Sequence, residues 1–365
     1  MRFEALTFLR FIAAAVVVLF HFGREPLGLT GFLAAGPEMV TFFFVLSGFV
    51  MGVSTFNKDV DKAFYWWCRG ARILPVYWLA ILVTIAVDRW QGAPLQYVPL
   101  FLNLTLLQSW FPEHALAINP PGWSLSVEAF FYLTFPLIAY MIRTSLASWK
   151  SLLSAALVFW VLTQIVLTAV LQLGFYQGFP SVSHSLVYYF PASHYCSFIV
   201  GVAGAQVVMQ RRRLLGSDWI SMLSVACAAL FVVAVINNEG SISSHAGMQF
   251  AYGSSFLAPI FLVMIVAVAL SSQAISRALS SRVLVLLGEA SFSLYILQHP
   301  VYRIFDLLLA KRLGLAPAPT FFAYFALLVG VSVLSFVCLE RPINTFMRKV
   351  FVDSFRRPRA ALAAT

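Results

Sequence analysis

The sequence predicts an all-α integral membrane protein, a single bundle of about ten transmembrane helices with both termini in the cytoplasm. Of the 365 residues, 61% are hydrophobic and 10% are charged, whereas soluble proteins are nearer half apolar and a quarter charged. The apolar runs reach the roughly 20 residues that a helix needs to cross a bilayer. These runs do not alternate polar with apolar residues, which argues against the strands of a membrane barrel.

The predicted spans follow one another with short loops between them. They lie near residues 5–22, 36–53, 73–88, 123–142, 152–173, 187–209, 219–236, 253–271, 290–310 and 320–339. The apolar stretch 97–110 is too short for a full span, so we expect an interfacial or re-entrant piece there. No hydrophilic stretch is long enough for a separate soluble domain. We therefore expect one transmembrane domain over 1–345 and a basic cytoplasmic tail over 346–365.

Basic residues predict the orientation of the bundle, because positively charged loops stay in the cytoplasm. The net charge is +10. With the N-terminus inside, the basic residues of the inner loops and tail are Arg2, Lys58, Lys62, Arg69, Arg72, Arg143, Lys150, Arg211, Arg212, Arg213, Arg277, Arg282 and six more from Arg341 to Arg359. The outer loops hold Arg24, Arg89, Lys311 and Arg312. We expect a multi-pass protein of the cytoplasmic (inner) membrane, whose charges meet membrane lipid and no nucleic acid.

Two charged or titratable residues stand at the ends of the first predicted span, in "LRFIAAAVVVLFHF". Arg10 and His21 are eleven residues apart, which places them on one helix face about 16 Å apart along the axis. They therefore predict a polar track through the first helix, in which His21 could act as a general base. The alternative is that Arg10 snorkels to lipid phosphates and His21 caps the outer end of the helix.

The second and third spans add further candidates. In "TFFFVLSGFVMG", Ser47 and Gly48 interrupt a very apolar span, and Gly52 follows Gly48 by four residues, a spacing that allows close helix packing. In "CRGARILPVYW", Arg69 and Arg72 lie at the cytoplasmic mouth of the third span. They are either topology signals or ligands for a phosphate-bearing cofactor.

A carboxylate and two serines open the fourth span, in "PPGWSLSVEAFFYLTFP". Glu128 lies on the same face as Ser124, with Ser126 nearby. A carboxylate inside a helix bundle is a functional candidate, with His21, Arg24 or an arginine as its partner. The alternative is a structural ion pair.

The ninth span carries the last candidate, in "LGEASFSLYILQHPVYR". His299 precedes Pro300 and therefore marks a kink where a backbone carbonyl is left free. A histidine there serves either packing and hydrogen bonding or catalysis. The cysteines form no CxxC pair, so the sequence predicts neither a metal site nor disulfides.

Five segments together resemble the membrane acyltransferase-3 family, in the same order along the chain. They are "LRFIAAAVVVLFH", "FFFVLSGFV", "RGARILPVYW", "GWSLSVEAFFYLTFP" and "SFSLYILQHP". Members of this family O-acylate cell-surface and secreted carbohydrates and some antibiotics. The resemblance implies a ten-helix bundle that takes an acyl group, usually acetyl, from cytoplasmic acyl-CoA and delivers it to a sugar hydroxyl.

The resemblance also implies roles for particular residues. His21 and Arg10 form the arginine–ten residues–histidine pair, Glu128 is the acid of the WSLSxE segment, and Ser47 is the serine of the SGF stretch. Arg69 and Arg72 are the cytoplasmic arginines. His21 would deprotonate the acceptor hydroxyl or be acylated itself, and Glu128 would orient the imidazole.

The expected site therefore has two sets of residues. The catalytic residues are His21 and Glu128, and the residues that bind substrate or cofactor are Arg10, Arg69, Arg72, Ser47, Ser124, Ser126 and His299. The resemblance implies acyl-CoA (acetyl-CoA) as the donor and a carbohydrate, free or lipid-linked, as the acceptor, and no metal is expected. The chain departs from the family in "VEAFFY", where many members have a second acid or a glutamine, and in a sparser arginine loop.

Two other functions remain open from the sequence. A proton-coupled transporter of a small solute also carries His, Arg and Glu inside its spans, although this sequence lacks the internal repeat common in transporters. A non-catalytic scaffold for polysaccharide export is the third reading. The acceptor stays open among capsule, exopolysaccharide, O-antigen, peptidoglycan, osmoregulated glucan and macrolide, with exopolysaccharide or a lipid-linked repeat unit favoured. The oligomeric state is not predicted.

Overall fold

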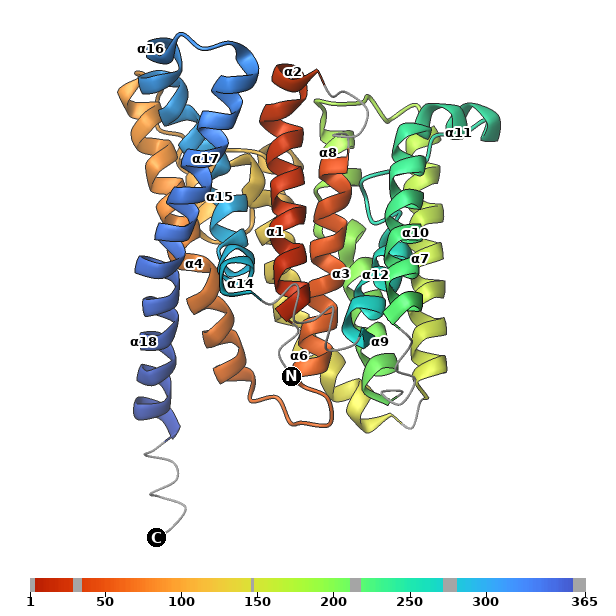
Figure 1. Cartoon of the computed structure of the whole chain (residues 1–365). Helices are drawn as coiled ribbons and strands as arrows, with labels where there is room; N and C mark the ends of the chain where they lie inside the picture. The colour runs from red at the N-terminus through yellow and green to blue at the C-terminus, as the bar shows by residue number, and fades with distance from the viewer. Residues whose placement is uncertain (1–3, 29–34, 146–147, 211–217, 272–280, 357–365) are drawn as a thin grey trace.

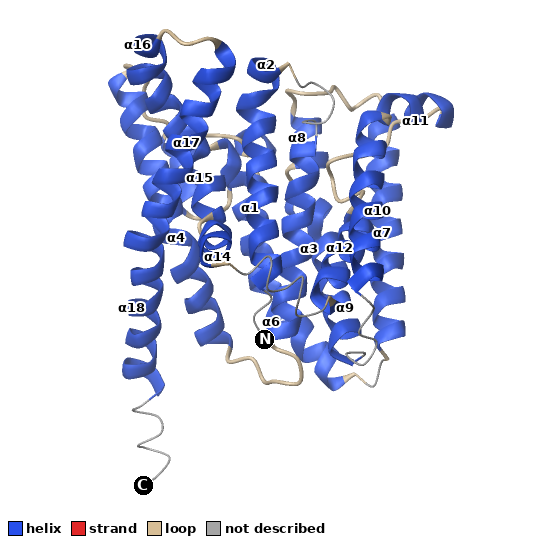
Figure 2. Ribbon diagram, viewed as in Figure 1, coloured by secondary structure: helices blue, strands red, loops and turns tan. Residues whose placement is uncertain are grey.

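The structure is a computed structural model that describes residues 4–28, 35–145, 148–210, 218–271 and 281–356. This described part is helical and holds no strand (Figure 2). The helices of its first half are α1 (Glu4–Val18), α2 (Arg24–Leu27), α3 (Gly36–Ser54), α4 (Lys62–Trp90), α5 (Tyr97–Leu104), α6 (Trp123–Thr144) and α7 (Trp149–Gln172). Those of the second half are α8 (Val182–Tyr188), α9 (Pro191–Gln210), α10 (Asp218–Asn237), α11 (Glu239–Ala246), α12 (Ala258–Leu270), α14 (Arg282–Glu289), α15 (Ser291–Phe305), α16 (Lys311–Leu313), α17 (Pro317–Ser335) and α18 (Arg341–Phe351).

Eight helical stretches in the described residues are long and apolar enough to cross a membrane. They are Ala5–Leu27, Gly36–Ser54, Lys62–Trp90, Pro120–Thr144, Trp149–Gln172, Val182–Gln210, Trp219–Asn237 and Pro317–Ser354, and they coincide with eight of the predicted spans. The predicted spans at 253–271 and 290–310 coincide with α12 and α15, which have only 13 and 15 residues. α15 continues through a π-helical turn, Asp306–Ala310, into α16.

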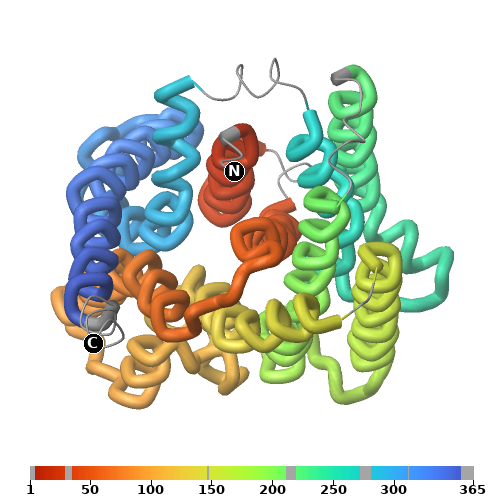
Figure 3. The backbone as a smooth tube through the Cα atoms, turned by 90° about the horizontal axis from the view of Figure 1, so that it is seen from below, coloured from red at the N-terminus to blue at the C-terminus, as the bar shows by residue number. Residues whose placement is uncertain are grey.

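The helices form one bundle in which α1 and α3 lie inside a ring of the others (Figure 3). α1 begins and α18 ends at the same face of the bundle, the lower face in Figure 1. Basic residues of the topology prediction that fall outside the described residues are Arg2, Arg211, Arg212, Arg213, Arg277, Arg357 and Arg359. The predicted boundary at residue 345 falls within α18, which packs against α4 through a 2.7 Å hydrogen bond from Trp67 Nε1 to the Met347 carbonyl.

Small residues bring α3 and α9 into direct backbone contact. A Cβ on Gly48 would lie 2.1 Å from the Phe198 carbonyl oxygen, and one on Gly201 would lie 2.0 Å from the Val45 carbonyl oxygen. The close approach predicted from Gly48 and Gly52 is thus confirmed, since a Cβ on Gly52 would meet Ala205 at 2.6 Å. Such contacts hold helices together where lipid offers no hydrophobic driving force between them.

Prolines inside helices expose carbonyls that tie the bundle together. Pro136 in α6 has no N–H for the Tyr132 carbonyl, which accepts instead from Trp66 Nε1 of α4 at 3.0 Å. Pro300 in α15 leaves the Ile296 carbonyl free, and Asn119 Nδ2 donates to it at 3.1 Å. The free carbonyl predicted at the Pro300 kink is therefore present.

The stretch 97–110 is a short helix followed by turns, as its length predicted, and it continues to residue 122 as a segment tucked into the bundle. α5 has eight residues, and the segment carries the fully buried side chains of Asn103, Gln108 and Asn119. Tyr77 of α4 donates to Asn103 Oδ1 at 3.0 Å and accepts from Gln108 Nε2 at 2.9 Å. These bonds satisfy the Tyr77 hydroxyl and the Asn103 side-chain oxygen, which are buried away from water.

Candidate active site

A cavity of about 1020 Å³ lies between α1, α3, α4, α6, α15 and α18. Its mouth is at the lower face of Figure 1, where the loop from α3 to α4 contributes Lys58, Asp59 and Asp61. Four residues of α18 also line it, namely Arg341, Asn344, Thr345 and Arg348. They follow one another at positions i, i+3, i+4 and i+7, which places them on one face of that helix. The cavity thus has a polar entrance that carries three basic and two acidic side chains.

Arg10, Arg69 and Arg72 all line this cavity, as half-buried side chains. Arg69 lies over the rings of Tyr65 and Tyr132, with its guanidinium carbon 5.3 and 5.4 Å from the two ring centres. Among the described residues, none of the three arginines has a carboxylate within 4.0 Å. Their hydrogen-bonding groups are therefore available to an anion in the cavity.

Glu128 lies deeper in the same cavity, on α6. Its Oε1 accepts hydrogen bonds from Ser47 Oγ of α3, at 3.1 Å, and from the Tyr132 hydroxyl one turn further along α6. Arg10 is attracted to Glu128 and to Glu340, and repelled by Arg72. Arg10, Glu128 and Glu340 all line this cavity.

The two serines beside Glu128 have different surroundings. Ser124 lines the cavity, and its hydroxyl donates to the Pro121 carbonyl at 3.0 Å. Ser126 is fully buried outside the cavity wall. Its hydroxyl donates to the Leu106 carbonyl at 2.6 Å and accepts from the Ser109 N–H at 3.4 Å. Ser126 thus anchors the segment that follows α5.

His21 lies at the other end of α1, in a π-helical turn formed by Leu19–Gly23 just before α2. π-Helical turns occur frequently at functional sites. The imidazole is exposed, and it does not line the cavity of Arg10 and Glu128. Its Nδ1 lies 3.0 Å from Oε1 of Gln298 on α15. Gln298 is fully buried, and its Nε2 donates to the Tyr295 carbonyl at 2.7 Å.

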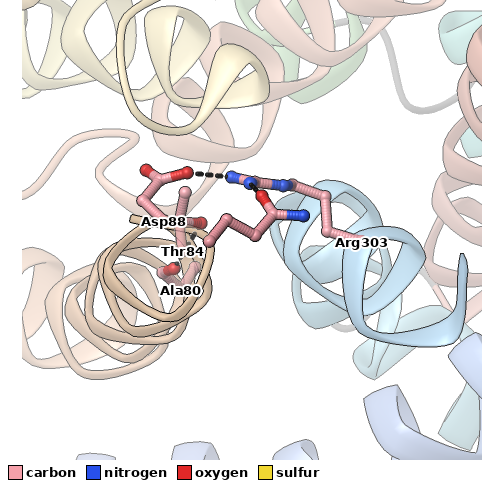
Figure 4. Close-up of polar contacts among 5 residues, drawn as sticks. Ala80, Thr84, Asp88 and Arg303 are labelled. Carbon is pink, nitrogen blue, oxygen red and sulfur yellow. Dashed lines mark hydrogen bonds and ion pairs between the residues drawn. The ribbon is translucent and has the colours of Figure 1, made fainter. Parts of the chain in front are cut away.

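His299 follows Gln298 and is half-buried. Its Nδ1 is buried and has no hydrogen-bond partner among the described residues. One turn further along α15, Arg303 pairs with Asp88 and donates to Gln91, both near the upper end of α4. Figure 4 shows the ion pair bridging the two helices. His299 interacts electrostatically with this pair and with His21.

The structure therefore divides the predicted site residues into two groups. Arg10, Ser47, Arg69, Arg72, Ser124 and Glu128 line the lower cavity, whereas His21 and His299 lie with Gln298 above it, and Ser126 belongs to neither group. The expected contact from Glu128 to the imidazole is not formed, because Glu128 bonds Ser47 and Tyr132 while Gln298 bonds His21.

One turn of α15 separates the two groups. Tyr295 lines the cavity, and its backbone carbonyl holds the Gln298 amide. Its ring meets that of Phe43 at a centre distance of 6.0 Å. A group that reaches the inner end of the cavity is thus one helical turn from the residue that contacts His21.

Sequence reasoning missed four features of the site. Tyr132 was detectable, since it follows Glu128 by four residues and therefore shares its helix face. Glu340, the polar face of α18 and Gln298 gave no such signal, because their partners are far away in the chain. Within the described residues, no group of three or more His, Cys, Asp or Glu side chains is arranged to hold a metal ion.

Comparisons with known proteins find similarity over almost the whole chain. A family model described as "Acyltransferase domain" matches residues 3–338. Acyltransferase MdmB of Streptomyces mycarofaciens is 29% identical over 350 residues, covering 86% of this chain and 83% of the relative. Exopolysaccharide production protein ExoZ of Rhizobium meliloti (strain 1021) is 27% identical over 336 residues, covering 84% of this chain and 89% of the relative. No solved structure matches the chain significantly.

Proposed function

Since the chain belongs to the acyltransferase-3 family, whose model matches it from residue 3 to residue 338, we propose that it is a membrane O-acyltransferase that moves an acyl group from acyl-CoA to a carbohydrate hydroxyl. Acetyl is the first acyl group to test. The observation that carries the proposal is the cavity in which Arg10, Arg69 and Arg72 lie without ion-pair partners among the described residues.

The lower face in Figure 1 is the cytoplasmic face in this proposal. Lys58 and Arg341 lie exposed at the cavity mouth there, and positively charged loops remain on the cytoplasmic side. The chain then crosses the cytoplasmic membrane ten times, with α12 and α15 completing the eight longer spans.

Acyl-CoA suits the cavity in charge and in shape. Its phosphates are at one end of a long, thin molecule, and its thioester is at the other. Arginine binds phosphate oxygens through paired N–H groups, so Arg69 and Arg72, with Arg341 and Arg348 at the mouth, are the proposed phosphate ligands. The thioester would then extend past Glu128 toward Tyr295, at the inner end.

His21 is the proposed general base at the opposite side of the bundle. A histidine titrates near neutral pH and accepts a proton in acyl transfer. Its exposed imidazole would meet the acceptor hydroxyl, while the thioester arrives from the cavity. Transfer is either direct or passes through an acylated His21.

The acceptor is proposed as an exopolysaccharide or a lipid-linked repeat unit. The relative ExoZ is named an exopolysaccharide production protein, and MdmB is named an acyltransferase. A Staphylococcus aureus (strain COL) relative whose name contains "O-acetyltransferase" is 24% identical over 360 residues, covering 92% of this chain and 56% of that protein. These names support an acyl group moved to oxygen.

Proton NMR and mass spectrometry of surface and secreted glycans test this proposal. Cells that express the wild type should carry an acyl group that cells with His21→Ala lack, at matched protein levels in the membrane. His245→Ala is the matched control, because His245 is exposed on α11 and bonds only the Ser241 carbonyl of its own helix among the described residues. Identical glycans from all three strains would count against carbohydrate transfer.

A further inference from the structure

We propose that Gln298 is the positioning residue for His21: it holds the imidazole with its proton on Nδ1, so that Nε2 is the nitrogen that accepts the acceptor's hydroxyl proton. The tautomer of His21 follows from hydrogen bonds alone. The role of Gln298 in the reaction rests on the proposed function.

The orientation of the Gln298 amide is fixed by its other end. Its Nε2 donates to the Tyr295 carbonyl at 2.7 Å, and that oxygen can only accept a hydrogen bond. If the amide were turned around, two carbonyl oxygens would face each other in a fully buried place, at a cost of about 1–3 kcal/mol. Oε1 of Gln298 therefore faces His21.

The orientation of the amide decides the tautomer of the imidazole. Oε1 is an acceptor without a proton, so His21 Nδ1, 3.0 Å away, must be the donor. A neutral imidazole carries a proton on only one nitrogen. Nε2 of His21 is therefore unprotonated, and among the described residues the bond to Gln298 is the hydrogen bond the imidazole makes. The side chain is exposed, and with Nδ1 held by Gln298, Nε2 is the nitrogen left for an acceptor.

The surrounding structure holds both Gln298 and His21 in place. Tyr324 of α17 donates its hydroxyl to the backbone carbonyl of Gln298 at 2.9 Å. Asn119 donates to the Ile296 carbonyl that Pro300 leaves free. The rings of Phe20 and Phe22 meet the imidazole edge-on, at centre distances of 5.3 and 6.0 Å. A base fixed by such contacts is oriented before the substrate arrives.

In the transfer step, Nε2 of His21 takes the proton of the acceptor hydroxyl. The oxygen's electron pair forms the new bond to the thioester carbonyl carbon, and the carbon–sulfur bond breaks. The leaving thiolate takes the proton from Nε2, which restores the Nδ1–H tautomer. Gln298 is neutral, so it orients the base without becoming a second proton acceptor.

Nitrogen-15 NMR of histidine-labelled protein in lipid bilayers tests the tautomer without donor or acceptor. The His21 signals are identified by their loss in His21→Gln. The expected result is a protonated Nδ1 and an unprotonated Nε2 in the wild type. Gln298→Glu, with its second oxygen protonated and donating to the Tyr295 carbonyl, keeps an acceptor beside Nδ1 and should keep Nδ1 protonated, whereas Gln298→Leu should give a mixture. The matched control is Gln164→Leu, which removes a buried glutamine that bonds the Ser254 carbonyl.

Steady-state kinetics supply the second readout. Gln298→Leu should lower kcat about 10- to 100-fold with an unchanged KM for acyl-CoA. This loss is smaller than the loss of a whole general base, and Gln298→Glu should recover part of the lost kcat.

A wild-type imidazole protonated on Nε2, or a Gln298→Leu variant with an unchanged tautomer, overturns the proposal. If Gln298→Leu fails to fold, the wild-type and Gln298→Glu spectra still decide. An Nδ1–H imidazole in a protein without transfer activity would support the positioning role and contradict the proposed function.

Discussion

Ser47 and Glu128 join two helices that are distant in the chain: the Ser47 hydroxyl of α3 donates to the Glu128 carboxylate of α6 across 3.1 Å. The bond brings the SGF and WSLSxE segments to one point of one cavity. Together with Tyr132, it leaves Glu128 oriented and facing Arg10. In the proposed enzyme, Glu128 therefore acts within the donor cavity and not as the partner of His21.

Replacing Glu128 by glutamine should reduce acyl transfer while leaving the fold intact. The amide keeps an acceptor for Ser47 and Tyr132 but removes the negative charge facing Arg10. We expect kcat to fall about 100-fold, the lower range for loss of a charged catalytic group. The rate at which purified protein consumes the thioester measures kcat. Glu113→Gln, an exposed glutamate outside the cavity, serves as the control, and equal activity in both variants would rule out a role for the Glu128 charge.

Replacing Arg72 by glutamine should weaken the binding of CoA. Arg72 lines the cavity without an ion-pair partner among the described residues, and a hydrogen bond to a charged group contributes about 1.5–3 kcal/mol. Kd should therefore rise about 10- to 100-fold, as isothermal calorimetry can show. Arg24→Gln should bind CoA normally, because Arg24 lies over the Phe20 ring near the other end of α1. Equal affinities for both variants would remove Arg72 from the donor site.

Adding a methyl group at Gly201 should destabilise the bundle. The new Cβ would lie 2.0 Å from the Val45 carbonyl oxygen, so α3 and α9 must separate, at a cost of about 1–3 kcal/mol. Thermal unfolding in detergent measures the change. Gly330→Ala is the matched helical control, since nothing lies within 4 Å of its added Cβ. A Gly201→Ala protein as stable as Gly330→Ala would show that the two helices are not in backbone contact.

Breaking the Asp88–Arg303 pair should loosen the contact between α4 and α15 (Figure 4). Asp88→Asn leaves a weaker hydrogen bond to Arg303, with an expected loss of about 1–2 kcal/mol. The same unfolding assay applies. Arg89→Gln is the neighbouring control, because Arg89 is exposed and bonds only the nearby Ala93 carbonyl among the described residues. If both variants unfold at the wild-type temperature, the pair contributes nothing to stability.

The sequence predicted the helical class and the positions of the spans well, because the mean hydropathy over about 20 residues indicates whether a helix can lie in the bilayer. Local spacing also predicted the close packing at Gly48 and the free carbonyl at Pro300. It could not name their partners Phe198 and Asn119, which depend on how distant helices pack.

The candidate site was predicted unevenly for the same reason. The residues that share the cavity came from motifs that each carry a charge or a hydroxyl in an apolar span. Gln298 was not found, since it is 277 residues from His21 and a glutamine in a helix carries no distinctive signal. The link from His21 to Glu128 was expected from the family resemblance and from the usual partners of a carboxylate inside a helix bundle, and neither fixes which neighbours a side chain faces.

The most direct test of acyl transfer uses proteoliposomes that contain the purified protein, acyl-CoA labelled in its acyl group, and a carbohydrate acceptor. The account predicts that label moves to the carbohydrate as free CoA thiol appears in equal amount, and that His21→Ala abolishes both. Passage of an unmodified solute coupled to protons, with the thioester intact, would contradict it and identify a transporter.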